Sequence, residues 1–99
     1  MAYISNLESI SDRISLGIEE KSMLRAITQA NDCSKSAHMD ETAIRKKYPK
    51  NWKIKGIRNS KRLFKKLKAK GLIRIVKTRP IEWGLTSLGH RIAMELDFC

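Results

Sequence analysis

The segment from Arg45 to Arg79 is the feature that most constrains how this chain can fold. Sixteen of its thirty-five residues are Lys or Arg, and none is Asp or Glu. Because like charges repel one another, this concentration costs stability unless a counter-charge is present. We therefore expect the fold to display these side chains on a surface that faces a partner of opposite charge.

The charge is unevenly divided along the chain. Residues 1–40 carry four basic and six acidic side chains, a net charge of −2, whereas residues 41–99 carry seventeen basic and four acidic ones, a net charge of +13. This asymmetry favours nucleic acid as the partner, ahead of an anionic membrane surface. Because the 99 residues are 41% hydrophobic, they can bury one modest core, and we expect a single domain.

The sequence also bears on location and redox state. No apolar run approaches the roughly 20 residues that span a bilayer, and the first residues lack a basic region followed by a hydrophobic one. We therefore expect a cytoplasmic, nucleoid-associated protein without a membrane partner. Cys33 and Cys99 are too few for a disulfide framework and form no C-x-x-C motif. Both are expected to be free thiols, with an intermolecular bridge through Cys99 as the alternative.

The first half of the chain predicts three helices. Apolar residues recur at helical spacing before Gly17, which is expected to end the first helix, and again between about Glu19 and Asn31. A short third helix is expected to begin after Asp40, which is placed as its N-cap, and to stop before Pro49. The following "PKNWKIKG" is expected to be a turn or an irregular link.

The second half predicts a helix, a hairpin and a final helix. The helix runs from about Ile57 to Lys70 and is closed by Gly71 in a left-handed conformation. "LIRIVK" and "IEWGL" are dense in β-branched and aromatic residues and predict two strands joined near Pro80, with Trp83 in the core. Thr86 or Ser87 is expected to cap the last helix.

This order of elements resembles a winged helix-turn-helix domain. "LFKKLKAKGLIRIV" resembles the end of a recognition helix, and "GLTSLGHRIAMEL" resembles the stretch after the wing in MarR-like, PadR-like and ArsR-like regulators. The resemblance covers about Glu19 to Leu96. It implies a mainly α domain with a small β-hairpin (α+β) over residues 18–99, ending in a C-terminal helix and preceded by an extra N-terminal helix over residues 1–17. The link "YPKNWKIKG" departs from it, since it is longer than the usual tight turn.

The resemblance implies that the helix from Ile57 to Lys70 lies in a DNA major groove. On a helical wheel its basic residues form a stripe opposite Leu67. Arginine can donate two parallel hydrogen bonds to guanine, and asparagine can pair with adenine, whereas lysine suits phosphate. We therefore assign Arg58, Arg62 and Asn59 to bases, and Lys55, Lys61 and Lys65 to phosphates.

Two further segments are expected to contact DNA. Lys77 and Arg79 belong to the tip of the hairpin, from which Arg79 can enter a minor groove. Arg45 and Lys46 are expected to hold the phosphate backbone. The predicted DNA-binding residues are Lys55, Arg58, Asn59, Lys61, Arg62, Lys65, Lys77, Arg79, Arg45 and Lys46.

A second apolar strip suggests a homodimer. Met94 and Phe98 lie off the main apolar face of the last helix. A twofold interface built from both terminal helices would pair two recognition helices. Its predicted residues are Ile4, Leu7, Ile10, Ile14, Met94 and Phe98. The alternative is that the N-terminal helix covers the C-terminal one within a monomer.

The motifs of an enzyme are missing. The sequence contains no nucleophile elbow, phosphate loop or metal-hydrolase motif, and Cys33 and His38 lack a second pair of metal ligands. We expect no catalysis, no cofactor and no metal.

The sequence predicts a protein that binds double-stranded DNA, specifically or generally, and regulates transcription. The alternatives are a ribosome-associated, RNA-binding winged-helix protein and a winged-helix module that binds an acidic protein.

Overall fold

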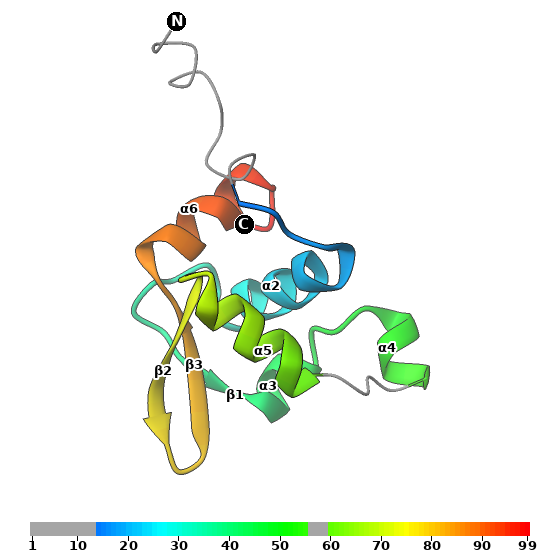
Figure 1. Cartoon of the computed structure of the whole chain (residues 1–99). Helices are drawn as coiled ribbons and strands as arrows, with labels where there is room; N and C mark the ends of the chain where they lie inside the picture. The colour runs from blue at the N-terminus through cyan, green and yellow to red at the C-terminus, as the bar shows by residue number, and fades with distance from the viewer. Residues whose placement is uncertain (1–13, 56–59) are drawn as a thin grey trace, which may run out of the picture.

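The computed structural model describes residues 14–55 and 60–99, without the side chains of residues 54 and 55. Within these residues the chain forms a small α+β domain with five helices and a three-stranded antiparallel sheet (Figure 1). The mixed helix and strand content predicted from the sequence is thus confirmed. In chain order the elements are α2 (Ile18–Ala30), β1 (Met39–Asp40), α3 (Glu41–Arg45), α4 (Lys50–Lys55), α5 (Ser60–Ala69), β2 (Ile73–Thr78), β3 (Ile81–Leu85) and α6 (Ser87–Glu95).

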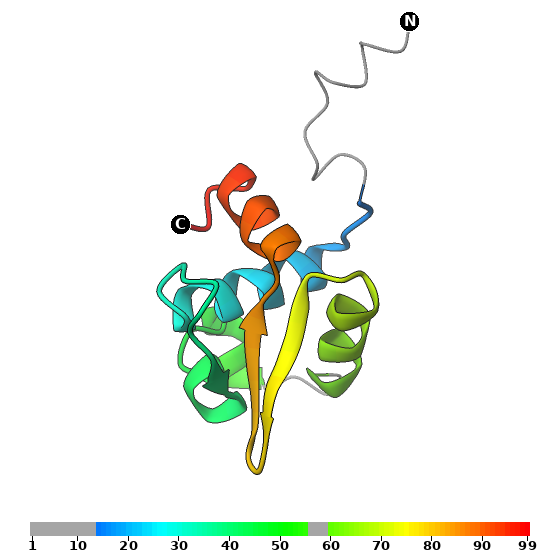
Figure 2. The same ribbon diagram turned by 90° about the vertical axis from the view of Figure 1, so that its left-hand side faces the viewer.

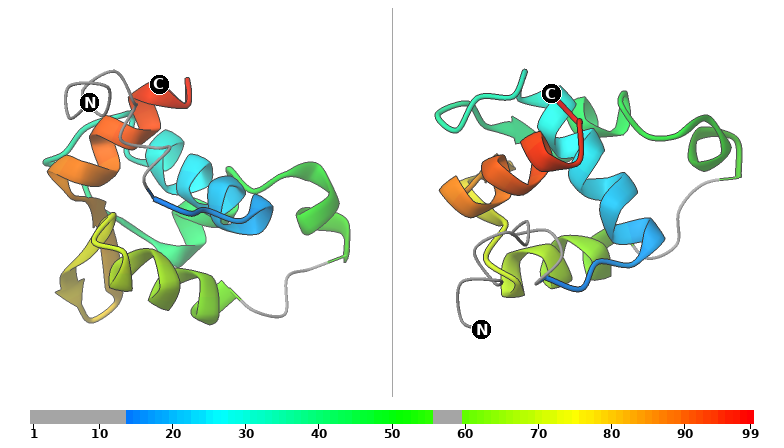
Figure 3. Two further views of the ribbon diagram at one scale, coloured as in Figure 1. Left: turned by 45° about the horizontal axis from the view of Figure 1, so that its top comes forward. Right: turned by 90° about the horizontal axis from the view of Figure 1, so that it is seen from above.

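Helix α2 lies at the centre of the domain, and α6 crosses it on the side away from the hairpin tip (Figure 3). The predicted span of α2 is confirmed to within a residue at each end. Gly17, however, is the N-cap of α2 and does not end a preceding helix as predicted, because the Glu20 carboxylate accepts a hydrogen bond from the Gly17 amide at 3.2 Å. Most of the predicted first helix, residues 1–13, lies outside the described residues.

The sheet has the strand order β1-β3-β2. The predicted hairpin is confirmed: β2 and β3 pair from Ile73 opposite Leu85 to Thr78 opposite Ile81, with an irregularity between Ile75 and Lys77. Strand β1 adds one short pairing, in which Met39 lies opposite Trp83. The sequence did not predict β1, because a two-residue strand carries no alternating pattern.

Two short helices precede α5. Asp40 caps α3 as predicted, accepting a hydrogen bond from the Ala43 amide at 2.9 Å. The prediction of a turn or irregular link after Pro49 is wrong, because residues 50–55 form helix α4. The Pro49 carbonyl accepts hydrogen bonds from the Trp52 and Lys53 amides, which starts this helix immediately after the proline.

Helix α5 is held against the sheet by a stripe of apolar residues. Leu63, Phe64 and Leu67 are buried, as the periodicity predicted. The Phe64 ring stacks on the indole of Trp83 with 4.8 Å between centroids, which confirms Trp83 as a core residue. Gly71 has a φ of +76°, the left-handed conformation expected of it after the helix. The predicted helix start at Ile57 lies outside the described residues.

The two motifs behind the winged-helix resemblance meet in space. The Thr86 hydroxyl caps α6 by accepting from the Gly89 amide at 2.9 Å and donates to the Gly71 carbonyl at 2.6 Å. The Thr86 amide donates to the Leu72 carbonyl at 3.1 Å. Gly89 lies so close to the Leu72 carbonyl that a Cβ added at Gly89 would be 1.9 Å from the carbonyl oxygen. This junction fixes α6 against the turn that follows α5.

Cys33 and Cys99 are joined by a disulfide, with 5.6 Å between their Cα atoms. The prediction of two free thiols is therefore wrong, and so is the alternative of an intermolecular bridge through Cys99. Phe98 packs against the core. The disulfide joins the segment after α6 to the turn that follows α2. The two cysteines are 66 positions apart, and no pattern in the sequence indicates that they are close in space.

Replacing Gly89 with alanine should destabilise the domain by about 1–3 kcal/mol, because the new methyl group overlaps the Leu72 carbonyl and α6 must shift. Urea denaturation followed by circular dichroism measures this loss. Ser87→Ala, an exposed change on the same helix, should stay within about 0.5 kcal/mol of wild type. Equal stability of the two variants would contradict the close packing at Gly89.

Opening the disulfide should cost about 2–4 kcal/mol, because the bridge constrains a long loop of the unfolded chain. Thermal denaturation of the wild type with and without dithiothreitol measures the difference. Cys99→Ser should match the reduced wild type and should be insensitive to the reductant. A wild-type melting temperature that reductant leaves unchanged would show that the bridge contributes nothing.

Candidate nucleic-acid interface

The solvent side of α5 is strongly basic. Leu63, Phe64 and Leu67 point into the domain, while the remaining helix surface carries exposed cationic side chains. These are Lys61, Arg62, Lys65, Lys66 and Lys68. Three of them, Lys61, Arg62 and Lys65, belong to the predicted DNA-binding residues, and the structure brings them together on one exposed surface.

Lys66 and Lys68 were not among the predicted DNA-binding residues. A signal for them was present in the sequence, since both fall within the basic stretch and neither occupies the apolar stripe. They lie roughly 100° to either side of Leu67 on the helical wheel, whereas the predicted stripe covers only the positions opposite Leu67. The basic surface of α5 is therefore wider than the stripe predicted from the sequence.

The five cations of α5 differ from other basic residues of the domain in having no ion pair. Among the residues that the structure describes, none of the five has a carboxylate within 4.0 Å, the limit for a salt bridge. Arg45 lies 3.5 Å from Glu41, and Lys77 lies 4.0 Å from Glu82. Within the described residues the cations of α5 form no salt bridge, although the charge of Lys66 helps to lower the pKa of Glu20. The basic surface of α5 is therefore available to an anion.

Lys70, just past the end of α5, has a structural role. Its ammonium group pairs with the Glu20 carboxylate and donates to the Ser15 carbonyl. Burial acts to raise the pKa of Glu20, but the hydrogen bonds from Lys70 and the Gly17 amide, together with the positive charges of Lys70 and Lys66, hold the pKa below its usual value. This ion pair attaches the C-terminal end of α5 to the start of α2.

The hairpin brings a second group of basic residues. Lys77 and Arg79 are exposed at its tip, at the bottom of the view in Figure 2. Glu82 lies behind the tip, where it contacts His38 Nδ1 as well as the Lys77 ammonium group. Within the described part of the chain, Arg79 makes no salt bridge.

The remaining predicted DNA-binding residues are only partly placed. Arg45 is exposed at the end of α3, and Lys46 follows it. Arg58 and Asn59, two of the three predicted base contacts, lie outside the described residues, as does the side chain of Lys55. Arg62 is thus the one predicted base contact that can be located within residues 14–55 and 60–99.

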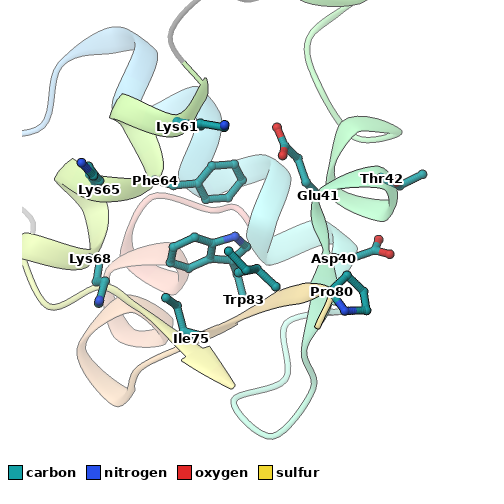
Figure 4. A pocket seen from close by; sticks show the side chains of 11 residues that line it. Asp40, Glu41, Thr42, Lys61, Phe64, Lys65, Lys68, Ile75, Pro80 and Trp83 are labelled. Atoms are coloured by element: carbon teal, nitrogen blue, oxygen red, sulfur yellow. The ribbon is translucent and has the colours of Figure 1, made fainter. Parts of the chain in front are cut away.

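A cavity of about 580 Å³ opens between α5 and the hairpin. Its lining comes from α5, from the two hairpin strands and the turn between them, and from the segment where β1 meets α3 (Figure 4). The lining residues are Asp40, Glu41, Thr42, Lys61, Phe64, Lys65, Lys68, Ile75, Pro80, Ile81 and Trp83. Sequence reasoning did not find this cavity. It shows that three lysines of α5 and apolar residues of the hairpin face one hollow.

The residues predicted for a dimer interface are divided. Ile4, Leu7 and Ile10 lie outside the described residues. Ile14 and Phe98 are half-buried and pack against the core of their own chain, whereas the Met94 side chain is 57% exposed on α6. Among the described members of the set, Met94 is therefore the one that is open to a partner.

The described residues contain neither a metal-binding cluster nor a membrane-spanning helix. These residues contain no group of three or more His, Cys, Asp and Glu side chains placed to hold a metal ion. None of the described helices combines the length and the apolar character that crossing a membrane requires.

No protein-family model matches the chain, and neither the curated proteins nor the solved structures contain a significant match to it. Its function is therefore inferred from its own charge and geometry.

Proposed function

We propose that the protein is a winged-helix domain that binds double-stranded DNA and regulates transcription by occupying it. The observation that carries the proposal is the unpaired basic surface of α5 beside a hairpin with a basic tip. Both elements line one cavity, so a single polyanion can contact them together. The order of the elements after α2 and the strand order β1-β3-β2 support the winged-helix part of the proposal.

In this proposal α5 is the recognition helix and lies in the major groove. Arg62 is exposed and carries a planar fork of donors, so it is assigned to a base edge. Lys61 and Lys65 hold flanking phosphates, because a flexible ammonium recognises charge rather than pattern. Arg58, Asn59 and Lys55 stay assigned as predicted, to two bases and one phosphate.

The hairpin acts as the wing. Its tip presents Lys77 and Arg79 beyond the end of the groove that α5 occupies, where Arg79 can enter the adjacent minor groove. Exposed Lys50 and Lys53 on α4 add cations between α3 and α5, where a standard helix-turn-helix has only a tight turn. We assign them to phosphate, with Arg45 and Lys46.

Binding to duplex DNA should depend steeply on salt. If the basic surface neutralises six to ten phosphates, the affinity should fall by about 10³ to 10⁵ between 50 and 200 mM salt. Fluorescence anisotropy of labelled DNA and RNA duplexes of matched sequence measures both the slope and the preference. Preference for RNA would replace this proposal with the RNA-binding alternative, and binding to neither duplex would favour an acidic protein partner.

Charge removal in the same assay locates the interface. The double variant Lys61→Gln and Lys65→Gln should bind more weakly and lower the salt slope by about two, since each lost phosphate contact reduces it by about one. Arg91→Gln on α6 also removes an exposed positive charge and should leave the slope unchanged. An equal loss for each removed charge in the two variants would mean that only net charge matters.

The twofold dimer predicted from the sequence stays part of the proposal, with Met94 at its centre. Sedimentation velocity of the wild type should then show a dimer, and Met94→Asp should give a monomer, because a buried charge without a partner disfavours association. Val76→Asp changes an exposed side chain on β2 and should stay dimeric. A wild type that sediments as a monomer at all concentrations would reject the dimer.

A further inference from the structure

We propose that the cavity between α5 and the hairpin binds one unpaired nucleotide, with its base on the apolar floor and its phosphate on the lysines. This inference rests on the proposed function, because it specifies which part of a nucleic acid that surface accepts. The cavity differs from the rest of the basic surface in three ways. It is hollow, its floor is apolar, and acidic side chains form one of its sides.

The floor suits a planar ring. Trp83 and Phe64 stack on each other beneath the cavity, and Ile75 and Pro80 add apolar side chains to its lining (Figure 4). Ile81 also lines the cavity and is 46% exposed, so its side chain is open to a ligand. The volume of about 580 Å³ falls within the range of small-molecule sites and has room for a base with its sugar.

The lysines stand on one side of this floor. Lys61, Lys65 and Lys68 all project from α5 around the cavity, and none has a salt bridge among the described residues. Three lysines without salt bridges, spaced along one side of an apolar cavity, suit an anionic group such as the phosphate of a nucleotide.

The opposite side carries Asp40, Glu41 and Thr42. Glu41 accepts a hydrogen bond from the Ser60 hydroxyl at 3.2 Å through Oε1, and Asp40 caps α3 through Oδ1. A carboxylate has two oxygens, so each of these groups can also accept from a ligand. A phosphate would be repelled here, whereas an exocyclic amino group on a base would be bound.

The two sides together give a ligand one orientation. Its phosphate lies at α5, and its hydrogen-bond donors lie at the start of α3. The backbone of an intact duplex offers phosphates without such donors or an unstacked ring, so it leaves both the floor and the acids unmatched. A single unpaired cytosine, adenine or guanine matches all three features. Thymine and uracil lack an amino group and should bind less well.

Fluorescence anisotropy with four DNA duplexes of one sequence tests the proposal. The probes carry a bulged deoxycytidine, a bulged thymidine, a bulged abasic site or no bulge. The wild type should bind the deoxycytidine bulge about fivefold to 150-fold more tightly than the abasic bulge, which is the usual effect of stacking one base. The thymidine bulge should be intermediate. Equal affinity for all four duplexes would overturn the proposal and leave the proposed function standing.

Variants separate the floor from the acidic side. Ile81→Ser should remove most of the preference for a bulged base, whereas Val76→Ser, an exposed apolar residue of the same hairpin outside the cavity, should keep it. Glu41→Gln should reduce the preference for deoxycytidine over thymidine while the preference over the abasic bulge remains. If Ile81→Ser and Val76→Ser, both shown to be folded by thermal denaturation, keep the preference equally, the base lies elsewhere and the proposal fails.

A second measurement separates this proposal from duplex binding itself. In a Trp52→Phe background, Trp83 is the remaining tryptophan and reports on the cavity. Saturable fluorescence changes with cytidine 5′-monophosphate, stronger than with uridine 5′-monophosphate, support the nucleotide site even if no duplex binds, an outcome that would reject the proposed function alone. No response to either nucleotide, together with equal binding of all four duplexes, would reject the nucleotide site alone.

Discussion

The packing of α5 is the constraint on which the rest of the domain depends. Five of its ten residues are Lys or Arg, and none of the five forms a salt bridge among the described residues, so their positive charges repel one another. Burial of Leu63, Phe64 and Leu67 offsets this repulsion, at about 1.5–3 kcal/mol for each side chain. The stack of Phe64 on Trp83 adds about 0.5–1.5 kcal/mol to this packing.

Elements whose signals are local could be predicted from the sequence. Asp40 and Thr86 cap helices because their side chains reach amides three residues ahead, and Gly71 ends α5 because it tolerates a positive φ. Where two local rules competed, the prediction was wrong. Helical spacing before Gly17 predicts a helix end there, yet Glu20 three residues later makes Gly17 a helix start. Pro49 predicts the end of one helix, although proline also favours the first turn of another.

The candidate site shows the same division between local and distant information. Exposure of Lys61, Arg62 and Lys65 followed from helical periodicity alone. The cavity did not, because its lining comes from separate stretches of sequence, near residue 40, along α5 and in the hairpin. Strand β1 brings the stretch near residue 40 beside Trp83 through a single short pairing, which no pattern in the sequence predicts. For the same reason the pairing of Cys33 with Cys99 became apparent only in the fold.

The disulfide changes the covalent topology of the molecule. With Cys33 bonded to Cys99, every element from β1 to α6 belongs to one closed covalent ring, and α2 lies outside it. A protease that cuts one peptide bond inside the ring opens it without releasing a fragment. Both sides of the cut, including the basic α5 and the hairpin, stay attached to the same chain until the bridge is reduced. A nicked molecule would therefore migrate as one species in a denaturing gel without reductant and as two pieces once thiol is added.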